Sequence, residues 1–301
     1  MEAGVQKYKA FCKVADSGSF TQAAGALGYS QSSISRMVAD LEQDWGLTLA
    51  LRSRAGVTLT PEGKALLPYI RRLCTNLDDI ESRVDDLKDN ATGVLRIGTI
   101  SSIATHWLPE VISSFKEKYP QMTYELLLGS YSEIEDWILS GRVDCGFIRL
   151  PAKEGLEAVP LTEDELMAVL PREHVLAGCE RVQVQEFCKY PFLSLAENRD
   201  VEDAGIFNSF GLRPEVLIET WGDYCIMSMV EKGMGISILP SLILKRIPHD
   251  VIVRPLEPKA SRTLAFAVRD GGYTQLSVQR FMEHLGAIDC GLNTEGPLKR
   301  G

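Results

Sequence analysis

The chain has 301 residues, of which 45% are hydrophobic and 24% charged, with a formal net charge of −9. A balanced composition at this length indicates more than one core, since single cores rarely grow far past about 250 residues. There is no run of about 18 apolar residues that would predict a membrane span, and the N-terminal residues lack the apolar segment of a secretory signal. We therefore expect a cytoplasmic protein.

Charged and reactive side chains are distributed unevenly. Residues 1–60 carry six basic and five acidic side chains, so the acidity lies further along the chain and an N-terminal contact with nucleic acid is permitted. The seven cysteines include no C-x-x-C pair and the four histidines are scattered. This pattern predicts free thiols, no metal and no cofactor.

Three short helices are predicted in the first 46 residues, because apolar residues recur there at helical spacing. Ser19 and Ser30 are suited to cap the second and third helices, and Gly28 supplies a permissive turn residue between them. Two helices joined by a tight turn of this kind form a helix-turn-helix. The predicted buried face of the third helix is Ile34, Val38 and Leu41.

The third helix begins with small polar residues and an arginine: Gln31, Ser32, Ser33, Ser35 and Arg36. In a helix-turn-helix the second helix enters the major groove with its N-terminal residues against base edges. Gln bonds adenine bidentately, Ser bonds bases or phosphates, and Arg reaches guanine or phosphate. These side chains are therefore predicted to contact double-stranded DNA, and an ordinary solvated helix start is the alternative.

A hairpin-like wing is predicted next, from two short strands around Ala55-Gly56. Arg52 and Arg54 lie near its tip, where they would contact phosphate or the minor groove. Two solvated surface arginines are the alternative.

A long helix is predicted after the wing, with Thr60 as its cap and Pro61 at its first position. Its apolar residues alternate steps of four and three: Leu66, Ile70, Leu73, Leu77, Ile80, Val84 and Leu87. Such a seam needs a partner helix. An acidic outer face, which includes Asp78, favours pairing with a second copy over packing within the chain. Pro68 predicts a kink or a register break.

The rest of the chain alternates strands and helices, which predicts a parallel sheet with right-handed crossovers in two α/β lobes and a cleft between them. Strands are predicted at 94–99, 123–128, 143–149, 166–170, 192–195, 215–220, 236–239 and 263–268, and helices at 103–118, 132–140, 221–232 and 274–285. The last strand is expected to return to the first lobe. Ser132 and Glu135 have the spacing of a capping box.

Several of these residues carry a family resemblance. The segments Gly18-Ser19-Phe20, Ala23-Ala24, Ser30-Gln31-Ser32 and Leu59-Thr60-Pro61-Glu62-Gly63 resemble the winged helix-turn-helix of LysR-type transcriptional regulators. The stretches LPEVISSFKEKYP, PREHVLA and MVEKGMGISILP resemble that family's effector domain, which is akin to periplasmic binding proteins. Ala50 departs from the pattern, because the family usually has Phe there, and we expect looser packing of the wing that alters how Arg52 is presented.

The resemblance implies an α/β protein with a winged helix-turn-helix DNA-binding domain at 1–60, a dimerisation linker helix at 61–90 and a two-lobed effector-binding domain at 91–301. It implies a sequence-specific transcriptional regulator and not an enzyme. The regulator would form a homodimer through the linker helix and then a homotetramer. It would bind promoter DNA under the control of a small-molecule effector.

The effector is expected beyond the carboxyl ends of the strands. Hydroxyls at the end of the first strand, with the free N–H groups of the following helix, suit a carboxylate or another anion. The candidate effector residues are Thr99, Ser101, Ser102, Ser130, Arg149, Thr220 and Trp221, with Ser194 through Asn198 facing them from the second lobe. Ordinary caps and loops are the alternative.

Three other classes of function are alternatives to this interpretation. An enzyme is disfavoured because no nucleophile elbow, P-loop or dinucleotide fingerprint occurs. A solute-binding protein for transport would need a signal peptide and no winged head. A redox sensor that uses Cys179 and Cys188 stays open.

Overall fold

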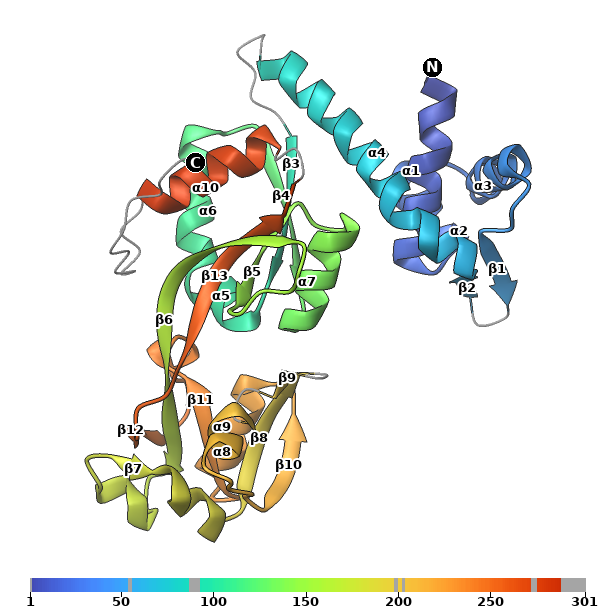
Figure 1. Cartoon of the computed structure of the whole chain (residues 1–301). Helices are drawn as coiled ribbons and strands as arrows, with labels where there is room; N and C mark the ends of the chain where they lie inside the picture. Colours follow the sequence, from blue (N-terminus) through green and yellow to red (C-terminus); the bar gives the residue numbers. More distant parts are fainter. Residues whose placement is uncertain are drawn as a thin grey trace. The chain divides into compact units, whose positions relative to one another are not determined.

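The structure is a computed structural model that describes residues 2–53, 56–86, 93–197, 200–201, 204–271 and 275–287 (Figure 1). The chain divides into two compact units. The first contains Met1–Gly93 with Leu139–Arg142, and the second contains Val94–Ile138 and Val143–Gly301. No helix in the described ranges is long and apolar enough to cross a membrane.

The first unit contains four helices and a two-stranded hairpin among its described residues. In chain order these are α1 (Glu2–Ser17), α2 (Phe20–Leu27), α3 (Gln31–Trp45), β1 (Ala50–Ser53), β2 (Gly56–Leu59) and α4 (Pro61–Asp86). The buried residues of α3 are Ile34, Val38 and Leu41, as helical periodicity predicts. They pack with Phe11 of α1 and Phe20 of α2 in one core, so apolar packing holds the buried faces of α2 and α3 against α1.

The predicted caps of this unit are confirmed. The Ser19 side chain accepts from the backbone of Gln22, and the Ser30 side chain accepts from the backbone of Ser33. The glycine that follows α2 adopts φ 70°, the left-handed conformation that ends a helix. These contacts satisfy backbone donors that a helix start leaves free.

The wing is fixed to α3 by one carboxylate. Glu42 Oε1 accepts from the backbone N–H of Leu49 at 2.7 Å and of Ala50 at 3.1 Å. In the first turn of α4, a Cβ on Gly63 would lie 2.1 Å from the Leu49 carbonyl oxygen, so only glycine allows α4 to pass this close to the residues that lead into the wing. The hairpin pairs Arg52 with Val57.

The linker helix α4 runs from Pro61 to Asp86 as one helix with Pro68 inside it. The expected kink or register break does not interrupt the helix within these described residues, which are continuous through Pro68. Ile70 is buried in the core of the unit, whereas Leu73, Ile80 and Val84 are 48%, 60% and 43% exposed. The seam is therefore covered near its start and open further on. Leu87 lies outside the described residues.

The second unit starts with alternating strands and helices and crosses between lobes several times. Its first elements are β3 (Gly93–Thr99), α5 (Ser101–His106), α6 (Leu108–Lys118), β4 (Met122–Leu128), α7 (Tyr131–Ser140), β5 (Cys145–Arg149) and β6 (Leu156–Pro171). The next are η1 (Val175–Gly178), β7 (Val182–Gln183), η2 (Val184–Lys189), β8 (Phe192–Glu197), β9 (Asp200–Val201), α8 (Ala204–Ser209), β10 (Val216–Thr220) and α9 (Asp223–Glu231). The last are β11 (Ile236–Pro240), η3 (Ile243–Lys245), β12 (Val251–Glu257), β13 (Ser261–Arg269) and α10 (Leu276–Ala287).

Two long strands, β6 and β13, join the lobes (Figure 1). The hydrogen-bonded order is β10-β8-β11-β6-β13-β5-β3-β4. β3 and β5 pair in parallel in the first lobe, as β8 does with β10 and β11 in the second. β13 pairs antiparallel with β5, which confirms that the chain returns to the first lobe.

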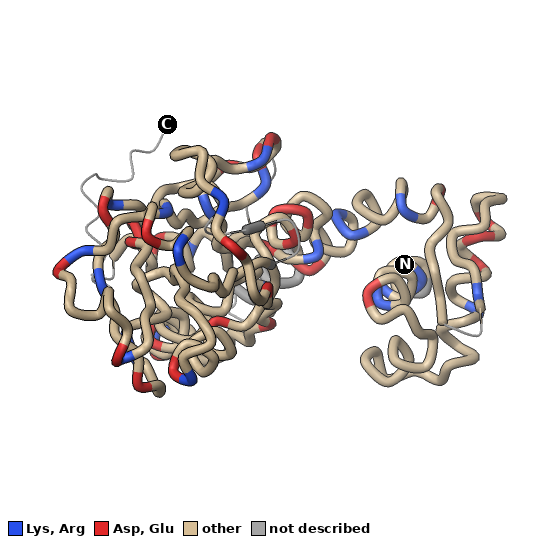
Figure 2. The backbone as a smooth tube through the Cα atoms, turned by 90° about the horizontal axis from the view of Figure 1, so that it is seen from below, with Lys and Arg blue, Asp and Glu red and all other residues tan. Residues whose placement is uncertain are grey.

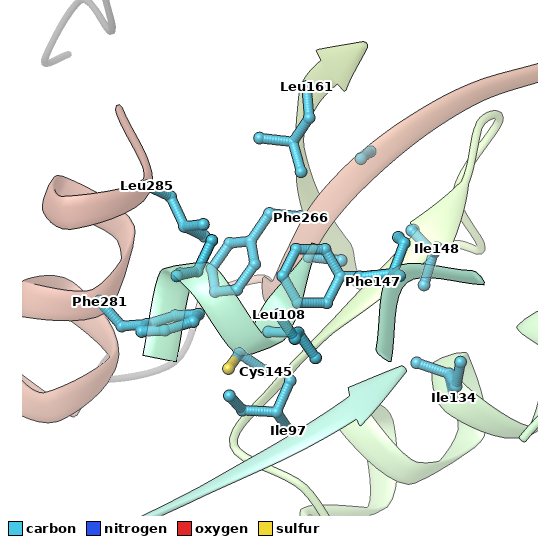
Figure 3. Packing of buried hydrophobic residues seen from close by; sticks show 14 of the residues in the cluster. Ile97, Leu108, Ile134, Cys145, Phe147, Ile148, Leu161, Phe266, Phe281 and Leu285 are labelled. Carbon is cyan, nitrogen blue, oxygen red and sulfur yellow. The ribbon is translucent and has the colours of Figure 1, made fainter. Parts of the chain in front are cut away.

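Each lobe has its own core. In the first lobe Phe147, Phe266 and Phe281 meet between the sheet and α10 (Figure 3), with ring centroids 5.5 Å apart for the first two and 6.1 Å for the last two. In the second lobe Phe187, Phe192 and Phe207 pack edge to face. Separate cores allow the lobes to act as two bodies joined by two strands.

Three sequence expectations for this unit are wrong in detail. The helix predicted at 103–118 is two helices, α5 and α6, which meet at Trp107, where the backbone leaves the helical region at φ −125° and ψ −55°. The capping box is formed by Ser130 and Glu133, which precede Ser132 and Glu135. The strand predicted at 166–170 is only the second half of β6. The first half contains a proline and several charged residues, and it pairs with β13.

Candidate DNA-binding surface and effector site

The start of α3 presents a cluster of hydroxyls. Ser30 Oγ lies 2.9 Å from Ser32 Oγ and 2.8 Å from Ser33 Oγ, and it accepts from the Ser33 N–H at 3.1 Å. Gln31 and Ser32 are exposed and Ser33 is half-buried. Because Ser30 completes the cap, the exposed Gln31 side chain is left to meet water or a partner, whereas the exposed Ser32 hydroxyl already contacts Ser30.

Arg52 of the wing lies over the helix-turn-helix and is not a free surface cation. Its Nη2 donates to Ser35 Oγ at 2.7 Å, and its guanidinium carbon lies 4.2 Å from the centre of the Phe20 ring. The contact brings together Arg52 and Ser35, two of the residues predicted to contact DNA. Arg36 is exposed on the same helix, and Arg54 lies outside the described residues.

The charge of this unit is mixed. Figure 2 shows acidic and basic positions interspersed along the backbone of the N-terminal unit. Two basic residues of α1 are committed to ion pairs, Lys7 with Asp44 and Lys9 with Asp78. Asp78, which the sequence places on an outer acidic face, therefore forms an ion pair inside the unit. Part of the positive charge of this unit is therefore neutralised by its own carboxylates.

The predicted effector residues meet other side chains of the second unit. Ser101 Oγ donates to Asp223 Oδ2 at 2.5 Å. Asp223 begins α9 in the other lobe and is only 7% exposed. The hydroxyl predicted to receive an effector carboxylate therefore holds a carboxylate of the chain itself, and the contact joins the lobes.

Ser102 belongs to a buried network centred on Arg262. The Arg262 guanidinium donates to Ser102 Oγ at 3.2 Å, to Tyr131 Oη at 2.7 Å and twice to Asp164 Oδ2 at 3.0 and 2.7 Å. The other oxygen of Asp164 accepts the backbone N–H of Leu242 at 2.9 Å. Arg262 and Asp164 face each other on β13 and β6. The network ties the first lobe to the strands that lead to the second.

Two further candidates are satisfied within their own segments. Ser130 donates its N–H to Glu133 Oε2 at 3.0 Å and accepts the Glu133 N–H at 3.4 Å, which makes it the cap of α7. Thr99 is fully buried and donates to the carbonyl of Ile100. These contacts favour a structural contribution from both residues.

The remaining candidates are more accessible. Arg149 is half-buried, with its guanidinium 5.1 Å from the centre of the Tyr131 ring. Thr220 is half-buried and Trp221 is 60% exposed. Ser194 is buried, and Asn198 lies outside the described residues. Arg149 is thus the predicted cation best able to reach a small ligand.

A histidine lies near the contact between the lobes. His106 Nε2 is 3.4 Å from the hydroxyl of Tyr224, which is on α9. Burial, followed by the charges of Arg246 and Lys245, lowers the pKa of His106, while Asp223 acts in the opposite direction. His106 is therefore mostly neutral at pH 7.

The cysteines outside residue 290 are free thiols in the structure. Cys179 is exposed at the end of η1, and Cys188 is half-buried in η2. Cys290 lies outside the described residues. Among the described residues, no cluster of three or more His, Cys, Asp or Glu side chains is arranged to hold a metal ion.

Comparison with known families identifies both parts of the chain. Residues 5–64 match the bacterial regulatory helix-turn-helix protein of the lysR family, and residues 88–288 match the LysR substrate binding domain. The chain belongs to the LysR family of transcriptional regulators.

Individual relatives match either nearly the whole LysR chain or more than half of it. The HTH-type transcriptional regulator YvbU of Bacillus subtilis is 27% identical over 282 residues, covering 93% of this chain and 96% of that protein. A probable hydrogen peroxide-inducible genes activator of Mycobacterium xenopi is 35% identical over 175 residues, covering 58% of this chain and 93% of that protein. A full-length variant of OxyR from Pseudomonas aeruginosa has the same fold, with a TM-score of 0.76, 21% identity and coverage of 97% and 98% of the two chains.

This LysR regulator therefore has a DNA-binding unit and an effector-binding domain, and its family consists of transcriptional regulators. Sequence reasoning missed the side chains that meet the candidate effector residues: Tyr131, Asp164, Asp223 and Arg262. Asp164 lies two and four residues before the apolar Leu166 and Ala168, so the three share one face of a strand, and a carboxylate on that inward face could have been noticed. Its partner on a strand 98 residues further along could not be named, since nothing local links them.

Proposed function

We propose that the start of α3 reads base edges in the major groove and that the wing contacts the adjacent backbone. The residues proposed to contact DNA are Gln31, Ser32, Ser33, Ser35, Arg36, Arg52 and Arg54. The observation that carries this proposal is the cap of α3. Ser30 satisfies the helix start, which leaves Gln31 and Ser32 exposed above a face buried through Ile34.

We also propose that residues 1–60, 61–90 and 91–301 are the DNA-binding, dimerisation and regulatory parts. The exposed apolar side chains of Leu73, Ile80 and Val84 support a homodimer through α4. A two-fold dimer suits DNA with two half-sites, and pairing of dimers would give a homotetramer.

For the effector, we infer a small anionic molecule that binds between the lobes. The Ser101 hydroxyl already donates to the Asp223 carboxylate, which supports recognition of a carboxylate at this position. Arg149 supplies a cation beside Tyr131, the residue that also accepts from Arg262. An anion at Ser101 would compete with Asp223, so binding would alter the contact between the lobes. This competition gives the effector a means of changing the regulator.

The test is selection of genomic fragments by the purified full chain, followed by affinity measurements on the selected site. Gln31→Ala should lower discrimination at one base pair by about 1–3 kcal/mol. The matched control is Gln43→Ala, which removes an exposed glutamine from the far end of the same helix and should leave discrimination unchanged. Equal losses for both variants, or no sequence preference in the parent protein, would overturn the proposal.

The genes beside the selected sites indicate the metabolites to test as effectors. Titration calorimetry with small carboxylates from those pathways should give tighter binding to Asp223→Asn than to the parent protein, because the variant removes the competing charge. Weaker binding of every carboxylate to Asp223→Asn would contradict the anionic assignment.

A further inference from the structure

Helices α1 and α4 pack with three cross-helix side-chain pairs in a regular antiparallel register. Lys9 Nζ lies 2.8 Å from Asp78 Oδ1 at one end, and Asp16 pairs with Arg71 at the other. Cys12 and Cys74 occupy the positions between these two ion pairs, and the interaction with the Cys74 side chain raises the pKa of Cys12.

The spacing explains why the two sulfur atoms meet. Along α1 the paired positions are 9, 12 and 16, and along α4 they are 78, 74 and 71. Steps of three and four keep residues on one face of a helix, so each trio forms a single stripe. The flanking ion pairs hold the stripes in register and hold Cys12 opposite Cys74. Both cysteines are only half-buried.

The local chemistry gives the two thiols different roles. The hydrogen bond to Cys74 raises the pKa of Cys12, and burial raises it further. Cys12 therefore keeps its proton. The raised pKa of Cys12 disfavours its thiolate, so Cys74 is assigned as the attacking nucleophile.

We propose that Cys12 and Cys74 are a modification site that forms a disulfide between α1 and α4 when the protein meets hydrogen peroxide. The Cys74 thiolate attacks one peroxide oxygen, which breaks the O–O bond and gives a sulfenic acid and, after protonation, one water molecule. The Cys12 sulfur then attacks the sulfenic sulfur and loses its proton, and the hydroxyl leaves as a second water molecule. Two thiols lose two electrons and one peroxide gains them.

The bond would change the setting of the linker helix. A disulfide holds its sulfur atoms about 2.05 Å apart, closer than two hydrogen-bonded thiols. α4 must therefore move toward α1. Helix α1 contributes Ala10 and Phe11 to the core that also contains the buried residues of α2 and α3. If α4 joins two winged units, as the proposed function requires, oxidation alters how the two recognition helices are presented to two half-sites. We expect affinity for the selected DNA to fall at least about tenfold.

The experiment treats the reduced full chain with stoichiometric hydrogen peroxide, blocks remaining thiols and maps tryptic peptides without reductant. The expected product joins residues 10–13 to residues 73–83. The undigested protein should still run as a single chain on a denaturing gel without reductant, which places the bond within one chain. Its formation should fail in Cys12→Ser and Cys74→Ser. It should persist in the matched control Cys179→Ser/Cys188→Ser, which removes the alternative pair.

The outcomes separate the chemistry from the proposed function. Peptides that stay reduced, that carry only overoxidised cysteine, or that link two chains would overturn the disulfide. A linked peptide with unchanged DNA affinity would overturn the regulatory consequence. A reduced protein without sequence preference for any duplex would contradict the proposed function, while the peptide map would still decide the disulfide.

Discussion

The guanidinium of Arg52 donates a 2.7 Å hydrogen bond to the Ser35 hydroxyl and lies 4.2 Å from the centre of the Phe20 ring. The wing is thereby joined to both helices of the helix-turn-helix before any DNA is present. A planar guanidinium serves both contacts, since it can stack on a ring while its N–H groups donate at the edge. The arginine is preorganised beside the residues proposed to read bases.

Arg52→Lys should therefore weaken DNA binding although it conserves the charge. Lysine cannot reproduce the stacked fork, so we expect about a tenfold loss of affinity, or about 1.4 kcal/mol. Fluorescence anisotropy at several salt concentrations would measure this loss with little change in the salt dependence. Arg213→Lys, at an exposed site in the second unit, is the control. Equal affinities for Arg52→Lys and the parent protein would contradict the proposed position of the wing.

Ser30 allows stability and DNA contact to be separated. Ser30→Ala removes the cap of α3 and should destabilise the first unit by about 1 kcal/mol. Ser30→Asp keeps a capping oxygen and should preserve stability, but it adds a negative charge where DNA phosphates approach. Thermal unfolding and anisotropy together test this pair. If Ser30→Asp bound DNA as tightly as the parent, the start of α3 would not face the phosphates.

The open part of the α4 seam predicts the assembly state. Ile80 is 60% exposed, so Ile80→Asp should leave the fold of the chain intact while it places a charge in an apolar helix pair. We expect the sedimentation coefficient to shift from dimer or larger toward monomer at micromolar concentration. Asn76→Asp adds the same charge at an exposed position off the seam and should not change it. Dissociation by both variants would indicate a general charge effect.

Local patterns predicted local structure well. The buried face of α3 and the serine caps follow from helical spacing and from hydrogen bonds between neighbouring residues, which the sequence carries directly. The capping box shows where this fails. Ser130 and Glu133 have the same spacing as Ser132 and Glu135, and the choice depends on Tyr131, which must be buried beside Arg262.

The candidate effector site was predicted only in part for the same reason. The end of β3 was located correctly, but its hydroxyls meet Asp223 and Arg262, which are 122 and 160 residues away along the chain. Such pairs depend on how the strands β6 and β13 cross between lobes. That crossing is a tertiary property, and no pattern within a short window of sequence reports it.

The buried pair of Arg262 and Asp164 predicts a large loss of stability when one partner is replaced, and a recovery when both are replaced. Asp164→Asn leaves the guanidinium buried without its counter-ion, which costs about 3–5 kcal/mol when one partner of a buried pair is removed. The double variant Asp164→Leu/Arg262→Met removes both charges and should recover most of that loss. Urea unfolding of the full chain would measure both. A double variant as unstable as the single one would mean that the hydrogen bonds to Tyr131 and Ser102 dominate.

Three histidines predict how stability depends on pH. Burial lowers the pKa of His106, His174 and His284 from the ordinary value of 6.5. Between the lowered values and 6.5 the unfolded chain binds more protons than the folded one, so stability rises as pH increases through this window and is lost on acidification. The lowered pKa values of Glu231 and Asp250 act in a lower range, because their ordinary values are 4.5 and 3.8.

The melting temperature of the parent protein should therefore increase between about pH 5 and pH 7, and the triple variant His106→Gln/His174→Gln/His284→Gln should show a shallower rise. The single variants apportion the effect, and His106→Gln is the informative one, because Tyr224 connects it to α9. A melting temperature that is flat over this range in the parent, or equally steep in the triple variant, would show that these imidazoles do not gain their neutral form on folding.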